Sequence, residues 1–278
     1  ATAAVSTVLC HNAGKNLIRT DRPGYLLLVD MGAGTTDLVV CKYQVDKQGG
    51  LKVELVNNWP RDAQEPSFGG REVDRVLEGY VEAYLAKALN PVLAPNARGI
   101  AAVPGAAKRW KELNVSVNLG ANKPVTNCAY ISTYKSMGML TGNFPAFDRS
   151  AFETFAQQGL KDYVKLVSDC LTDTAGKDAD FEAAGVDLVI LTGGHSAWYF
   201  AREIVDGTMA GYLEHPALAQ VRAHKDHVVN LPNPQSTVSL GLVYSKLPLR
   251  LNKPPVEPPV KPPVKPSVEP GFEGDVVD

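Results

Sequence analysis

Cysteines are few in this chain, and no two of them are close in the sequence. They lie at Cys10, Cys41, Cys128 and Cys170, and no C-x-x-C spacing occurs. This spacing argues against a zinc knuckle and against a dithiol redox site. We therefore expect reduced thiols, mostly buried as small hydrophobic side chains, as suits a reducing compartment such as the cytoplasm.

An excess of charge of one sign is also lacking. The 28 Lys and Arg residues nearly balance the 30 Asp and Glu residues, so nothing indicates nucleic-acid binding. The chain contains no uninterrupted apolar run of about 18 residues and no basic segment followed by an apolar one, so we expect neither a membrane span nor a signal peptide. With 45% hydrophobic residues in 278, the chain can bury a sizeable core, and we expect a cytoplasmic protein. It begins with Ala1 rather than Met, which suggests a processed product or part of a longer protein.

The clearest change in composition occurs near the C-terminal end. From Lys253 the sequence reads KPPVEPPVKPPVKPSVEP, a four-residue repeat of a charged residue, two prolines and a valine. Because proline fixes φ and has no amide hydrogen, this repeat predicts an extended polyproline II segment within a Pro-rich tail over 248–278. The tail would act as a spacer, or as a ligand for a proline-binding protein partner, since P-x-x-P recurs in it.

Residues 1–247 mix strand and helix patterns, which is typical of the α/β class. Apolar runs and alternation predict strands at 25–29, 37–45, 51–56, 115–119, 125–130, 186–191 and 228–231. Helical spacing and capping residues predict helices at 70–89, 101–113, from Asp148 towards 171, from about 196, and at 235–246. We expect a central mixed sheet with helices on both faces, plus a smaller α+β insertion between about residues 70 and 145.

The first motif that indicates chemistry is DMGAGTTD, at residues 30–37. An apolar strand ends at Asp30, a glycine turn follows, and a second strand begins at Asp37. Glycines allow successive backbone N–H groups to face an anion, and Thr35 and Thr36 add hydroxyl donors. Asp30 is placed to hold Mg²⁺ through water or to orient an attacking water. The alternative is a tight glycine hairpin with a polar tip.

The second motif is VILTGGHS, at residues 189–196. A buried strand again ends in two glycines, here before a predicted helix. Close backbone approach and a helix N-terminus suit the α-phosphate and ribose of a nucleotide.

The order of these motifs resembles the actin-like ATPase superfamily, with its ribonuclease H-like lobes, and within it the second half of the heat-shock-70 nucleotide-binding domain. The 30–37 segment is similar to the family's second phosphate loop, and FGGREVD at 68–74 is similar to the start of its next helix. LTGG at 191–194 matches its adenosine loop, and NPQSTVSLG at 233–241 matches its closing helix. ATAA at 1–4 looks like the end of its E-P-T-A-A-A segment.

The resemblance implies an ATP or ADP site with Mg²⁺, and it implies a role for each matching residue. Asp30 would hold the metal ion and act in catalysis with Thr35. The β- and γ-phosphates would contact the turn (Gly32, Ala33, Gly34, Thr35), and the adenosine side would be formed by Gly193, Gly194 and His195. Gly69 and Gly70 would lie near the nucleotide. The lysine-rich adenosine helix falls at Lys108 and Arg109 in one register and at 111–113 in another.

The sequence also departs from the family pattern. The family's first lobe, with its own phosphate loop, should precede Ala1, and nothing in this chain supplies it. Ala197 stands where the family often has an adenine-packing arginine, which leaves His195 or Trp198 as the nearest replacements. We therefore keep three hypotheses: an ATP-hydrolysing lobe of a nucleotide-dependent switch, a scaffold that has lost catalysis, and a filament-forming or membrane-linked actin homologue of the cell-division or pilus-assembly type.

Overall fold

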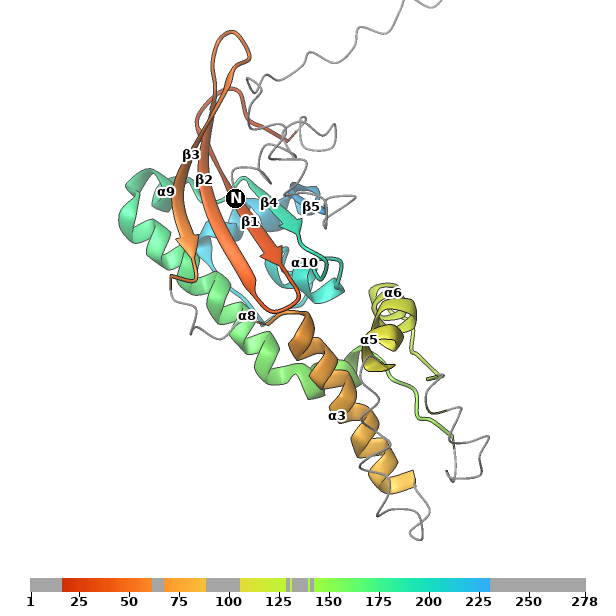
Figure 1. The fold of residues 1–278 in the computed structure, drawn as a ribbon. Helices are drawn as coiled ribbons and strands as arrows, with labels where there is room; N and C mark the ends of the chain where they lie inside the picture. The colour runs from red at the N-terminus through yellow and green to blue at the C-terminus, as the bar shows by residue number, and fades with distance from the viewer. Residues whose placement is uncertain are drawn as a thin grey trace, which may run out of the picture.

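The computed structural model describes residues 17–61, 68–88, 106–128, 131, 140 and 143–230. Its centre is a five-stranded sheet in the order β3-β2-β1-β4-β5 (Figure 1). The strands are β1 (Gly24–Met31), β2 (Thr36–Val45), β3 (Leu51–Trp59), β4 (Leu188–Thr192) and β5 (Val228–Asn230). The pairs β1–β2 and β2–β3 are antiparallel, whereas β1–β4 and β4–β5 are parallel. The predicted α/β class with a mixed sheet is confirmed.

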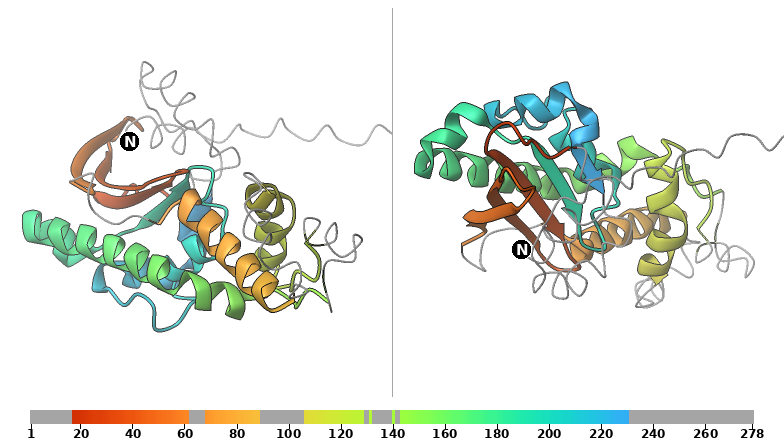
Figure 2. Two further views of the ribbon diagram at one scale, coloured as in Figure 1. Left: turned by 60° about the horizontal axis from the view of Figure 1, so that its bottom comes forward. Right: turned by 90° about the horizontal axis from the view of Figure 1, so that it is seen from above.

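The helices lie along one side of this sheet and beyond its end. The longest is α8 (Arg149–Lys177), which crosses the sheet, while α3 (Gly70–Ala88) extends away from it, as Figures 1 and 2 show. A shorter helical segment beside α3 consists of α5 (Ala106–Trp110), the π-helical turn η1 (Lys111–Val115) and α6 (Ser116–Gly120). Within the described residues, the other elements are α9 (Ala179–Ala184), α10 (Tyr199–Val205), η2 (Pro216–Leu218), α11 (Ala219–Ala223) and η3 (Lys225–His227).

Alternation along β1 divides the core into two clusters. Leu27 and Val29 face the large cluster, which includes residues of α3, α8, α9, α10 and α11, whereas Leu26 and Leu28 face a smaller one. Outside the strands, the described members of the smaller cluster are Leu17 and Ile18. Within the described residues, helices therefore pack against one face of the sheet, and the expected helical layer on the other face stays a prediction.

Most predicted elements appear within a few residues of their expected bounds. Asp148 caps α8 as predicted, because its carboxylate accepts a hydrogen bond of 2.8 Å from the Ala151 amide. The strand predicted at 115–119 is wrong: these residues belong to η1 and α6. In place of the strand predicted at 125–130, the described residues form an isolated bridge between Val125 and Phe147. The helix predicted from about 196 begins at Tyr199.

Several predictions lie outside the described residues, among them the Pro-rich tail, the helix at 235–246 and Cys10. The other three cysteines, Cys41, Cys128 and Cys170, are buried, as expected. Burial raises the pKa of Cys41 to about 11 and that of Cys170 to about 12, so both thiols stay protonated at neutral pH. No helix in the described part of the chain has the length and apolar character needed to cross a membrane.

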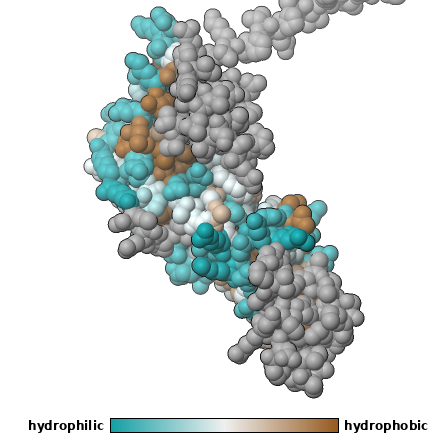
Figure 3. Space-filling model, in the orientation of Figure 1, coloured by the Kyte–Doolittle hydropathy of each residue, from teal (hydrophilic) through white to brown (hydrophobic). Residues whose placement is uncertain are grey.

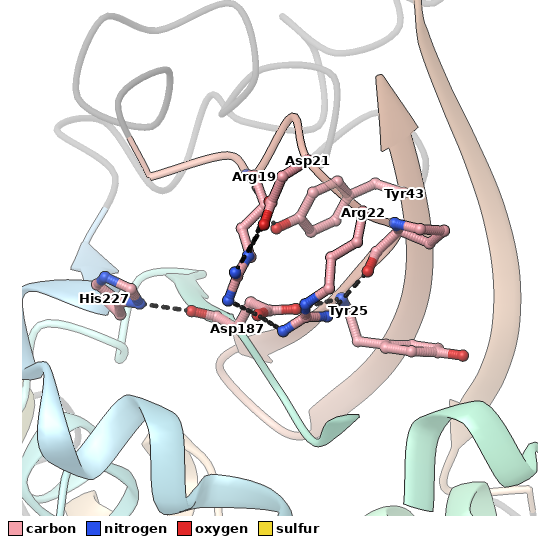
Figure 4. A network of polar contacts seen from close by, with 8 residues as sticks. Arg19, Asp21, Arg22, Tyr25, Tyr43, Asp187 and His227 are labelled. Carbon is pink, nitrogen blue, oxygen red and sulfur yellow. Dashed lines mark hydrogen bonds and ion pairs between the residues drawn. The ribbon is translucent and has the colours of Figure 1, made fainter. Parts of the chain in front are cut away.

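A polar network fixes the start of β1 against the start of β4 (Figure 4). The Asp187 side chain is 2% exposed and accepts hydrogen bonds from the Tyr25 amide (2.9 Å) and the Arg22 guanidinium (3.0 Å). The Asp187 amide donates to the Tyr25 carbonyl (2.8 Å), and its carbonyl lies 2.8 Å from Nδ1 of His227. The register of β1 and β4 is thereby set at the end of the sheet opposite to the two glycine turns.

Candidate functional site

The two glycine motifs meet at the end of β1 and β4. Because these strands are parallel neighbours, Asp30 is the register partner of Thr192, and both strands end at the same edge of the sheet. The amide of His195 donates to the carbonyl of Met31 (3.0 Å), which ties the turn after β4 to the end of β1. The sequence predicted this convergence, and ligand sites in α/β proteins commonly lie beyond such strand ends.

Asp30 stands beside a second carboxylate at this edge. Asp37 is its register partner on β2, so the two side chains leave the sheet on the same face. Burial raises the pKa of Asp30 above its ordinary value, and the charge of Asp37 raises it further. The arrangement disfavours the ionised form of Asp30, and a cation placed beside these carboxylates would relieve the repulsion.

The turn between β1 and β2 is held against the start of α3. The amides of Gly70 and Arg71 donate to the carbonyls of Gly32 (3.1 Å) and Ala33 (2.7 Å). A Cβ on Gly69 would lie 3.1 Å from backbone atoms of Gly34 and Thr35, which is tighter than most Cβ contacts, so glycine favours this close approach. Glu72 completes the helix start, because its carboxylate accepts a hydrogen bond of 3.2 Å from the Gly69 amide.

The turn after β4 also requires a glycine. Gly193 has φ +85°, a value that L-residues rarely adopt. A Cβ at this position would overlap the Met31 carbonyl and the Asp30 carboxylate. The backbone of this turn is therefore pressed against the end of β1, next to the predicted metal ligand.

A buried cation joins three elements at the site. Nζ of Lys111, whose side chain is 3% exposed, lies 2.6 Å from Oδ1 of Asp74, 3.0 Å from Nε2 of His195 and 3.3 Å from the Gly70 carbonyl. The His195 ring also fills the space above Gly70, where an added Cβ would overlap it. The start of α3, the π-helical turn η1 and the turn after β4 are thus locked together around Lys111.

The tautomer of His195 follows from these contacts. Because the Lys111 ammonium can only donate, Nε2 of His195 accepts and the ring proton resides on Nδ1. Burial lowers the pKa of His195, and the positive charge of Lys111 lowers it further. Nδ1 is buried and has no hydrogen-bond partner among the described residues, although the backbone of Gly32 is close enough to oppose part of this pKa shift.

The predicted site residues occupy different positions around the turn. Thr35 is exposed, and its hydroxyl donates to Asp37 (3.2 Å). Thr36 is the next residue and therefore points to the opposite face, where its buried hydroxyl donates to the Phe68 carbonyl (2.9 Å). Its side chain holds the segment before α3 rather than facing the exposed side of the turn.

The residues predicted for the adenosine side are arranged differently from what the sequence indicated. Lys108 is exposed on α5, whereas Lys111 is buried at the centre of the site. The alternative register of the resemblance placed the adenosine helix at 111–113, but it assigned no role to Lys111. Gly194 is exposed beside His195, as a ligand-facing position would be. Trp198 belongs to the core and stacks on Phe152, with ring centroids 5.1 Å apart.

Metal-ligand groups are sparse in the described part of the chain. No cluster of three or more His, Cys, Asp or Glu side chains there is arranged to hold a metal ion. Mg²⁺ nevertheless commonly binds through one or two carboxylates together with waters and substrate phosphates, and the Asp30–Asp37 pair fits that mode. Two surface hollows, one lined by residues of β3 and α9 and one along α8 beside Tyr212, contain no residue of the glycine turns.

Comparison of the chain with protein-family models and with curated proteins finds no significant match. The resemblance described above therefore stays a prediction, and a function has to be argued from the site.

Proposed function

We propose that this chain forms one lobe of a Mg²⁺–ATP site of the actin-like ATPase type. The observation that carries the proposal is the junction of the two glycine turns and the start of α3 beside Asp30. Three backbone hydrogen bonds, of 2.7 to 3.1 Å, hold this junction together. A rigid junction of glycine backbone at strand ends allows a polyphosphate to approach closely, because glycine carries no Cβ.

In this proposal the β1–β2 turn contacts the β- and γ-phosphates. Gly32, Ala33 and Gly34 supply the backbone surface. The Thr35 hydroxyl, which donates to Asp37 in the structure, would have to turn towards the ligand to donate to a phosphate oxygen. Asp30 would hold Mg²⁺ through water, and the bound ion would neutralise both the carboxylates and the phosphates. Asp30 would also orient a water towards the terminal phosphate, so hydrolysis would follow if a second lobe closed on the nucleotide.

The turn after β4 would receive the nucleoside and the α-phosphate. Gly193 and Gly194 provide the close backbone approach, and His195 lies beside them. In the structure His195 is held by Lys111 above Gly70. A nucleoside that entered between these residues would have to displace the ring or stack on it.

The filled space above Gly70 also supports a second candidate function. If His195 permanently closes this space, the chain would keep the fold as a nucleotide-free interaction module. The two functions differ in one measurable respect, which is whether the glycine turns respond to ATP.

The test is a titration of the full chain with ATP and Mg²⁺ by calorimetry and by backbone amide NMR. We expect saturable shifts at Gly32, Gly34, Gly193 and Gly194, and at least tenfold weaker binding for Asp30→Asn. Asp162→Asn on α8 serves as a control of equal chemistry outside the site and should bind like the unmodified chain. If the glycine amides do not respond at millimolar ATP, the chain lacks this function and the scaffold alternative stands.

A further inference from the structure

The residue that follows the glycines at the start of α3 is an arginine, and its side chain lies across the β1–β2 turn. A Cβ on Gly34 would be 3.5 Å from Cζ of Arg71 and 3.6 Å from its Nε, so the guanidinium is in contact range of the turn. The Arg71 amide donates to the Ala33 carbonyl (2.7 Å), which fixes the backbone from which the side chain extends. The side chain itself is exposed.

The amides of the helix start are already occupied. Gly69, Gly70 and Arg71 donate to Glu72, Gly32 and Ala33 respectively. These groups are therefore bonded within the protein, and the helix N-terminus does not itself serve as an anion site. A positive group for an anion at this turn has to come from a side chain.

The acidic residues near the start of α3 are engaged elsewhere. Glu72 caps Gly69 and lies 3.3 Å from the Arg75 guanidinium, and Asp74 pairs with Lys111. Within the described residues, no carboxylate lies within ion-pair distance of Arg71. Its guanidinium thus presents five N–H donors to solvent directly above the turn.

The negative charge around the turn means that a phosphate ligand would need a positively charged side chain there. Asp30 and Asp37 make this edge of the sheet negative, and they would repel the phosphates of a nucleotide. Lys111 is buried and already paired with Asp74, so it adds no free charge at the turn. Arg71 is a cation in contact range of Gly34, and a guanidinium binds phosphate oxygens in a bidentate manner.

We propose that Arg71 binds the terminal phosphates of the ligand and selects triphosphates over monophosphates at this site. The inference rests on the proposed function and adds a residue that the sequence patterns did not assign. An AMP bound through the turn after β4 would not reach Arg71, whereas the γ-phosphate of ATP on the β1–β2 turn would.

The experiment compares the binding of ATP, ADP and AMP, each with Mg²⁺, to the full chain and to Arg71→Ala, Arg71→Lys and Arg75→Ala. We expect Arg71→Ala to weaken ATP binding about tenfold and to leave AMP binding within twofold, because a charge-assisted phosphate contact is lost. Arg71→Lys should retain part of the affinity. Arg75→Ala, one position of like charge further along α3, should bind as the unmodified chain does.

Two results would overturn the inference: unchanged ATP affinity in Arg71→Ala, or an equal loss for ATP and AMP, which would mean that Arg71 shapes the turn instead. A titration with inorganic tripolyphosphate, followed at the Arg71 Nε–Hε NMR signal, separates this failure from failure of the proposed function. If tripolyphosphate shifts the Arg71 signal but ATP has no effect, Arg71 binds anions and the proposal of a nucleotide site is rejected. No response to either ligand would reject both.

Discussion

Nζ of Lys111 lies 3.0 Å from Nε2 of His195, so the lysine side chain and the imidazole ring share a hydrogen bond at the centre of the site. The contact connects a π-helical turn with the turn after β4. π-Helical turns often occur at functional sites, where they re-aim one side chain. Here the turn begins at Lys111, whose Nζ also meets Asp74 and the Gly70 carbonyl.

Replacing Lys111 with methionine should destabilise the protein by about 2 kcal/mol. Removing one partner of a buried ion pair costs roughly 3–5 kcal/mol, and the cost is reduced here because the Asp74 side chain, 26% exposed, keeps some contact with water. The measurement is the free energy of unfolding in urea. Lys108→Met, on the exposed side of the same segment, should change it by less than about 0.5 kcal/mol. Equal effects of the two substitutions would contradict the placement of Lys111.

Gly70→Ala should be costly because the new methyl group would overlap the His195 ring. Overpacking of this kind costs about 1–3 kcal/mol. In a His195→Ala background the ring is absent, so the same substitution should cost at least about 1 kcal/mol less, which a double-mutant cycle measures directly. Gly193→Ala is the contrasting case: its methyl group would overlap the Met31 carbonyl, so His195→Ala should give no relief. Additive effects of Gly70→Ala and His195→Ala would show that the ring does not lie above Gly70.

The stability of the protein should depend on pH through His195. Burial and Lys111 hold the pKa of His195 below the ordinary value of 6.5, so the unfolded chain takes up a proton at a pH where the folded chain does not. This contribution makes the folded state less stable as the pH falls below 6.5, and it levels off below the folded-state pKa. His195→Gln, which can still accept from Lys111, should remove this part of the slope between pH 7.5 and 5.

A second histidine, His215, also has a pKa that burial lowers. Because His215 is present in both the unmodified chain and His195→Gln, its contribution to the pH dependence of stability cancels in the difference between them. An NMR titration of the His195 ring should give a midpoint below 6.5. A midpoint at or above 6.5 would mean that the ring is not held neutral against Lys111.

The sequence predicted the parts of the fold that are encoded by local patterns. The apolar run before Asp30 forms β1, the cap at Asp148 begins α8, and the two glycine turns meet because parallel strands end at one edge. These features need only alternation, capping chemistry and the geometry of parallel strands. The face of the sheet to which the Thr36 side chain points could also have been predicted. Successive side chains of a strand point to opposite faces, so Thr36 and Asp37 lie on different ones.

The segment 115–119 shows where local patterns are ambiguous. Val115, Val117 and Leu119 alternate as a strand would, but positions 115 and 119 are also one helical turn apart. In the structure Val115 and Leu119 are buried, while Val117 is 67% exposed. Leu113 and Val117 lie on this segment, where Figure 3 shows a small apolar patch. In the structure α6 packs against α10, and the preceding α5 packs against α3. Such tertiary packing can override local preference, and no local pattern fixed the position of Lys111.

Asp187→Ala should destabilise the protein by about 3 kcal/mol, although Asp187 lies at the opposite end of the sheet from the glycine turns. The buried Asp187 carboxylate accepts hydrogen bonds from the Tyr25 amide and from Arg22 (Figure 4). Without this carboxylate the buried Tyr25 amide would be unpaired, and the guanidinium groups of Arg19 and Arg22 would lose the acceptor that they share. Unfolding in urea measures the loss. Asp21→Ala removes an exposed carboxylate of the same network and should cost less than about 1 kcal/mol. If Asp187→Ala is no worse than Asp21→Ala, the register of β1 and β4 does not depend on this carboxylate.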